Sequence, residues 1–213
     1  MSVKIRTRFA VVALVIGLLC LAQAAYIPAK AWLAQRLIAM AWQQRVEGGD
    51  TGRPWPWADT APVARLYQPR LAIDQYVLQG ASGRNLAFGP AHVGASSAPS
   101  QSGNIVISGH RDTHFAWLRH LRPGDELVLE RDDRRWRRYR VIETSVHHER
   151  EFGLVDPLAG DQLRLLTCYP FLQVDPGTPW RFLVTAVPDG VGWQPGELSP
   201  PVRTRSDDAS VVL

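Results

Sequence analysis

The chain contains two cysteines, Cys20 and Cys168. Cys20 lies inside an apolar segment near the N-terminus, so Cys168 has no partner for an intrachain disulfide in the rest of the chain. Cys168 follows the apolar run LRLLT and precedes Tyr169-Pro170, a sequence typical of the end of a strand, where a substrate can reach a side chain. Cys168 is therefore a candidate nucleophile, and a buried, inert cysteine is the alternative that these residues leave open.

A thiol nucleophile needs a base or proton donor, and a group that stabilises charge on the attacked carbonyl. His110 ends the apolar run NIVISGH, so two strand ends would present His110 and Cys168 at one barrel mouth. Arg181 begins the final apolar run, RFLVTAV, thirteen residues after Cys168, and a guanidinium can bind a carbonyl or an oxyanion. The other five histidines are expected to be solvated or hydrogen-bonded at the surface: His92, His114, His120, His147 and His148.

A metal site is the competing interpretation of the same region. His110, Asp112 and His114 have the spacing H-x-D-x-H, with His120 nearby, and alternate residues of a strand lie on one side. Short clusters of this kind are common, and no other ligand motif supports this one. We therefore expect neither a metal nor another cofactor.

The charge of the chain is uneven. The net charge is +4 and the pI about 9.4, but residues 1–46 hold six basic and no acidic side chains. The other 167 residues thus carry 4 minus 6, that is −2. A surface that tracks phosphates needs a net basic face, so nucleic acid is excluded as the expected partner.

Residues 9–27, FAVVALVIGLLCLAQAAYI, are nineteen almost wholly apolar residues that follow Lys4, Arg6 and Arg8. This length is just enough to span a bilayer, and the positive flank is expected to stay in the cytoplasm. We expect a single-pass anchor in the inner membrane with the rest of the chain on the periplasmic side. A cleaved signal peptide, cut after Ala22-Gln23-Ala24, is the alternative.

The remaining sequence divides by composition. Residues 1–8 form the basic cytoplasmic segment, 28–46 an amphipathic helix, 47–60 a linker, 61–188 the folded domain and 189–213 a disordered tail. Within the domain, short β-type runs are broken by Gly, Pro, Asn and Asp, with short helices expected near residues 83–87 and 115–121. No long helical period follows residue 46, so an all-β, closed or nearly closed barrel is favoured over an α/β sheet.

The segments SGHRDTHF (108–115) and LLTCYPF (165–171), followed by Arg181, resemble the His, Cys and Arg motifs of sortases. The pieces PAKAWLAQ, PWPWADTAPVARL and GASGRNLAFGPAH further resemble the Gram-negative group called class GN sortases. The resemblance covers about residues 28–187. It implies an eight-stranded sortase-type β-barrel with short helices, preceded by an N-terminal membrane helix.

Carried over by position, the resemblance makes Cys168 the nucleophile, His110 the general acid and base, and Arg181 the group that positions substrate and stabilises the oxyanion. Thr167 and His92 are the expected substrate-binding residues. The common sortase pattern is Thr-Leu-x-Thr-Cys, whereas this chain has Arg164 in place of the first Thr.

The implied activity is that of a membrane-anchored cysteine transpeptidase. Its substrate would be a secreted protein with a C-terminal Leu-Pro-any-Thr-Gly-like sorting signal, cleaved between Thr and Gly, and its acceptor an amine that the sequence does not identify. The alternatives are an exported cysteine peptidase, with water as acceptor, and a non-catalytic binding module of the cell envelope.

Overall fold

The structure is a computed structural model that describes residues 3–48, 52–151, 160–172, 177–190 and 192–196. Its helices are α1 (Val3–Val46), η1 (Pro69–Leu71), α2 (Gly83–Leu86), η2 (Ala116–His120) and η3 (Glu149–Glu151). Its strands are β1 (Pro62–Gln68), β2 (Ile73–Gln79), β3 (Ala91–His92), β4 (Asn104–Ser108), β5 (Glu126–Arg131), β6 (Arg135–His148), β7 (Gln162–Tyr169), β8 (Trp180–Pro188) and β9 (Gln194–Pro195).

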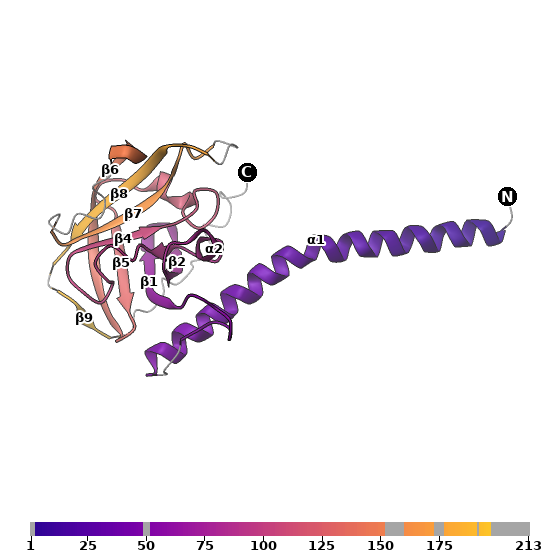
Figure 1. Ribbon diagram of the computed structural model, residues 1–213, viewed down its shortest axis with the longest axis horizontal. Coiled ribbons are helices and arrows are strands. Elements are labelled where there is room, and N and C mark those ends of the chain that lie inside the picture. The colour runs from indigo at the N-terminus through magenta and orange to yellow at the C-terminus, as the bar shows by residue number, and fades with distance from the viewer. Residues whose placement is uncertain (1–2, 49–51, 152–159, 173–176, 191, 197–213) are drawn as a thin grey trace. The chain divides into compact units, whose positions relative to one another are not determined.

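Eight of these strands form a closed barrel (Figure 1). They follow one another in the order β5-β1-β2-β3-β4-β7-β8-β6, and pairing between β5 and β6 closes the ring. The β2–β3 and β4–β7 pairs are parallel, and the other pairs in the ring are antiparallel. The expected eight-stranded barrel is confirmed, and closure leaves no open sheet edge in the ring.

Alternation along the strands decides which side chains fill the barrel. On β7, Leu163, Leu165 and Thr167 are buried, while Leu166 and Cys168 between and beyond them are partly exposed. The neighbouring strands add Ile105, Ile107, Val184 and Ala186 to the same core. Because successive side chains point to opposite faces, Cys168 lies on the outer face of the barrel wall.

A second, smaller core lies between the end of α1 and the barrel. Ile38 packs with Leu78 and Ala91, and Trp42 is 2% exposed with its ring centroid 6.1 Å from that of Tyr76. Residues from Ile38 onward form one compact unit with the barrel, and residues up to 37 form another.

The N-terminal segment differs from expectation in its continuity. Residues 3–46 form one helix that passes through Pro28, where the sequence suggested a boundary between two segments. Pro28 lacks an N–H, but the residues around it are mostly Ala, Leu and other good helix formers, so the loss at one position does not end the helix. In the described residues, this is the one helix that is long and apolar enough to cross a membrane.

The C-terminal region also differs from expectation. Within the predicted tail of 189–213, Gln194–Pro195 form β9 on β6, opposite Arg135 and Trp136. Trp193 packs against the main core, and the guanidinium of Arg131 lies 4.7 Å from its ring centroid. One partly buried aromatic side chain thus holds a stretch whose composition predicted disorder, and residues 197–213 lie outside the described part of the chain.

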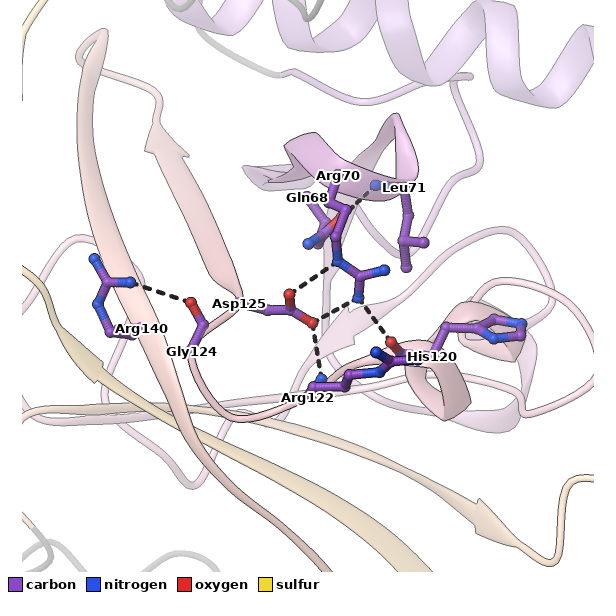
Figure 2. Close-up of polar contacts among 8 residues, drawn as sticks. All are labelled: Gln68, Arg70, Leu71, His120, Arg122, Gly124, Asp125 and Arg140. Atoms are coloured by element: carbon purple, nitrogen blue, oxygen red, sulfur yellow. Dashed lines mark hydrogen bonds and ion pairs between the residues drawn. The ribbon is translucent and has the colours of Figure 1, made fainter. Parts of the chain in front are cut away.

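Polar contacts tie the turn after β1 to the turn before β5 (Figure 2). The guanidinium of Arg70 donates to both carboxylate oxygens of Asp125, at 2.9 and 2.6 Å, and to the carbonyl of His120 at 2.7 Å. The backbone N–H of Arg122 also donates to Asp125, at 2.8 Å. One carboxylate therefore links η1 to the segment that leads from η2 into β5.

Candidate active site

Cys168 occupies the second-last position of β7, and Arg181 occupies the second position of β8. The two are direct cross-strand partners in the antiparallel β7–β8 pair. Residues in direct register point to the same face, with Cβ atoms about 4.5–5.5 Å apart. Cys168 is a free thiol that is partly exposed, so the structure places the thiol and the guanidinium on one accessible face.

His110 reaches the same level through the parallel β4–β7 pair. Ser108 is in register with Leu166, and the chain stays beside β7 for one residue more, because the Gly109 N–H donates to the Leu166 carbonyl at 3.1 Å. His110 and Cys168 each lie two residues beyond that pair. The imidazole is exposed, and the chain leaves the barrel at this point.

The turn after β4 is built around Gly109. The His110 carbonyl accepts the N–H of Phe115 at 2.9 Å, which folds the chain back on itself. The ring of Phe115 is fully buried, and a Cβ on Gly109 would lie 2.7 Å from its Cγ. Packing therefore requires a glycine before His110, because the Phe115 ring fills the space that a larger side chain at position 109 would need.

Thr167 and His92 are the residues predicted to bind substrate, and both are buried in the structure. Thr167 is 2% exposed and donates its hydroxyl to the Gly109 carbonyl at 2.7 Å. This bond holds the residue before His110 against the residue before Cys168. Thr167 is thus placed to position the two candidate catalytic residues, with its hydroxyl already engaged.

His92 lies on β3 and is 7% exposed. Its Nε2 lies 2.9 Å from the Ser97 carbonyl and 3.1 Å from the Ser96 hydroxyl. Burial lowers the pKa of His92, and the contact with the Ser97 carbonyl offsets part of that effect. These contacts fix the loop after β3, and they leave little His92 surface for a substrate.

His114 is more enclosed than the expected surface histidine. Burial lowers its pKa, a hydrogen bond to the Ala87 carbonyl opposes this, and the nearby His110 lowers it further. The pattern H-x-D-x-H does not form a metal site, because no group of three His, Cys, Asp or Glu side chains within the described ranges is placed to hold an ion. His114 instead lies beside His110 as a second imidazole.

Arg181 is held by three contacts that the sequence did not predict. Its Nη1 donates to the carbonyls of Thr178 and Trp180, and its Nη2 donates to the carboxylate of Glu149 at 2.9 Å. Glu149 begins η3, directly after β6. The contact between Glu149 and Arg181 depends on the register of β6 with β8, and these strands are distant in sequence. Spacing along the chain therefore does not indicate this contact.

Comparison with known proteins identifies the family of this chain. Residues 66–189, more than half of the chain, match the family model of the sortase domain. This chain belongs to the sortase family.

Relatives of this sortase support the assignment. It is 29% identical over 117 residues to sortase D of Bacillus subtilis (strain 168), a match that covers 54% of this chain and 58% of that relative's length. The catalytic domain of B. anthracis SrtD is 30% identical, with a TM-score of 0.50, 61% of this chain covered and 88% of that chain. Sortase A of Listeria monocytogenes, 22% identical with a TM-score of 0.54 and coverages of 61% and 88%, shares the fold.

Arg164 stands where the common sortase pattern has a threonine. It lies on the outer face of β7, in register with Val106 of β4 and Thr185 of β8. Its Nε donates to Gln162 at 3.0 Å. This sortase therefore carries a cation on the same strand face as Cys168, four residues from the thiol.

Proposed function

We propose that this sortase is a membrane-anchored cysteine transpeptidase that cleaves a Leu-Pro-any-Thr-Gly-like sorting signal between Thr and Gly. Sortases are in general cysteine transpeptidases that act on proteins with sorting signals. The observation that carries the proposal is the direct register of Cys168 with Arg181. The parallel pairing that brings His110 level with Cys168 supplies the third group.

In the first half-reaction, the Cys168 thiolate attacks the threonine carbonyl and a carbon–sulfur bond forms. The carbonyl oxygen becomes an oxyanion, which Arg181 stabilises by hydrogen bonds and charge. When the oxyanion collapses, the peptide C–N bond breaks. Protonated His110 gives its proton to the departing glycine amine, and a thioester remains on Cys168.

In the second half-reaction, neutral His110 takes a proton from the incoming amine as that amine attacks the thioester. The carbon–sulfur bond breaks, a new amide forms, and the Cys168 thiolate returns beside protonated His110. One imidazole therefore serves both steps, as acid and then as base. The cycle starts from thiolate and imidazolium together.

We further propose that α1 anchors the enzyme in the inner membrane with the barrel on the periplasmic side. Support comes from the apolar helix and from Lys4, Arg6 and Arg8 before it. The motifs shared with class GN sortases support a Gram-negative subtype. The substrate would then be an exported protein that carries the sorting signal, and the acceptor an amine in the envelope.

The test is intact-mass spectrometry of the full-length protein in detergent with a pool of Leu-Pro-any-Thr-Gly-like peptides. We expect a wild-type adduct with the mass left after cleavage between Thr and Gly, and none with Cys168→Ala. His110→Ala and Arg181→Ala should form the adduct at least about 100-fold more slowly. An adduct of equal yield in Cys168→Ala would refute thioester chemistry at this residue.

Added amine distinguishes transfer from hydrolysis. A transpeptidase gives ligated product in place of free acid, whereas a cysteine peptidase gives the acid whatever the amine concentration. Absence of any adduct, with a Cys168 thiol that alkylating reagents modify only after denaturation, would instead favour a binding module.

A further inference from the structure

The donors of Arg181 divide into two groups. A guanidinium carries five N–H donors, and three of them are engaged by protein acceptors here. Both Nη1 hydrogens go to the carbonyls of Thr178 and Trp180, and one Nη2 hydrogen goes to Glu149. In the part of the chain that the structure describes, Nε–H and the second Nη2–H donate to no protein acceptor. Two donors of one guanidinium are therefore available to a substrate.

Glu149 is itself fixed in place at the end of β6. Its backbone N–H donates to the Pro179 carbonyl at 2.7 Å, which ties it to the residue before β8. The last residue of β6, His148, is in register with Trp180, and the two rings meet edge to face at 5.1 Å. The carboxylate thus reaches Arg181 from a backbone position set by the β6–β8 pair.

The environment of this ion pair argues against a mainly stabilising role. The side chain of Glu149 is 49% exposed and that of Arg181 is 24% exposed. Ion pairs this exposed contribute little to folding. A contact that restricts a long, flexible side chain beside a nucleophile contributes mainly to geometry, because catalysis by hydrogen-bond donors depends on their being oriented before charge develops.

We propose that Glu149 is a positioning residue for the transpeptidation. Its carboxylate and the two carbonyls hold the Arg181 guanidinium, so that Nε–H and the remaining Nη2–H are oriented toward the carbonyl that Cys168 attacks. This inference rests on the proposed function. It adds that Arg181 is oriented by Glu149 of η3, which directly follows β6, the strand on the far side of β8 from Cys168.

The experiment measures peptide acylation and transfer by the full-length enzyme in detergent, with Glu149→Ala, Glu149→Gln and the control Glu143→Ala. Glu143 is an exposed carboxylate on β6, the strand that ends one residue before Glu149. We expect Glu149→Ala to lower kcat about 10- to 100-fold with KM changed less than about threefold, because the lost orientation matters only in the transition state. Glu149→Gln, which keeps an acceptor oxygen, should recover part of the rate, and Glu143→Ala should match the wild type.

A double-mutant cycle with Arg181→Ala separates positioning from a general structural effect. If Glu149 acts through Arg181, then Glu149→Ala should not slow the Arg181→Ala enzyme further, and both single variants should unfold at the wild-type temperature. A Glu149→Ala enzyme within twofold of the wild-type kcat, or an additive loss in the cycle, would overturn the inference. A wild-type enzyme that forms no thioester would instead overturn the proposed function on which the inference depends.

Discussion

The position of His110 depends on the small size of its neighbour Gly109. Gly109 is hydrogen-bonded to β7 on two sides, through the Leu166 carbonyl and the Thr167 hydroxyl, and its Cα faces the buried Phe115 ring. The imidazole of His110 is exposed and has little packing of its own. Its location therefore depends on the backbone of its neighbour.

We expect Gly109→Ala to destabilise the protein by about 1–3 kcal/mol, the usual cost of overpacking a filled core. The added Cβ would lie 2.7 Å from Phe115 Cγ, so either the ring or the His110 turn must move. Urea unfolding measures the loss, and the acylation rate should fall with it.

The matched control for that substitution is Gly94→Ala, because a Cβ at Gly94 meets nothing within 4 Å. Its unfolding midpoint should equal that of the wild type. Adding Phe115→Leu to Gly109→Ala should restore part of the lost rate by making room for the methyl group. An unchanged midpoint for Gly109→Ala would show that the ring is not a constraint.

The candidate catalytic residues were recognisable from residue type and from their places at strand ends. Cys168, His110 and Arg181 each adjoin an apolar run, and a thiol nucleophile needs such partners. Glu149 was not recognisable, because its contact with Arg181 follows from the β6–β8 register and one ion pair. Likewise, the burial of Thr167 follows from β-strand alternation, which the motif alone does not reveal.

At the scale of elements, the turn before β5 depends on one carboxylate. The hydrogen bond from Arg70 is the main cause that lowers the pKa of Asp125; burial opposes it, and the Arg122 N–H lowers the pKa further. The Asp125 carboxylate thus binds its proton less tightly in the folded state than in the unfolded chain. Its contribution to stability is present above the unfolded pKa of about 3.9 and is lost as the pH falls through the lower folded value.

We therefore expect Asp125→Asn to be less stable than the wild type at pH 7, and the difference to shrink steadily below about pH 4. Because Arg70 is 45% exposed, solvent screening should keep the difference near about 1 kcal/mol. Urea unfolding at a series of pH values gives both curves. Asp59→Asn, at an exposed pair with Arg84, is the control, and it should have little effect at any pH. A difference for Asp125→Asn that grows toward low pH would contradict this account.

Most strands could be predicted from short β-type runs broken by Gly, Pro, Asn and Asp, and two could not. β3 and β9 are two residues long, and two residues carry no period. β6 is one fourteen-residue strand. A bulge between Val141 and Glu143 interrupts its alternation.

At the scale of the whole molecule, the end of α1 is part of the folded domain. Trp42 is 2% exposed, and Ile38 packs on Leu78 and Ala91. The sequence predicts an amphipathic helix over residues 28–46 that either lies on the membrane or packs on the domain, since composition cannot tell a face that meets lipid from a face that meets a barrel. A soluble form that begins after Val46 would lack both side chains.

Trp42→Ala should destabilise the protein by about 3–5 kcal/mol, as expected for truncation of a large buried aromatic side chain. Trp57, which is 82% exposed, gives the matched control, and Trp57→Ala should change stability by less than about 0.5 kcal/mol. Urea unfolding of the full-length protein in detergent compares the two. Equal, small effects would show that the barrel does not need the end of α1.

The parallel pairing of β4 with β7 has a consequence for the order of events during folding. His110 and Cys168 are 58 positions apart in the chain, and the contacts that align them join strands separated by β5 and β6 in sequence. Closing so long a segment carries a large entropic cost, so such pairings form late. A newly synthesised chain thus has its thiol before His110 is aligned with that thiol. On the proposed function, thioester formation requires the completed ring of strands, so the return of activity during refolding would report this last step.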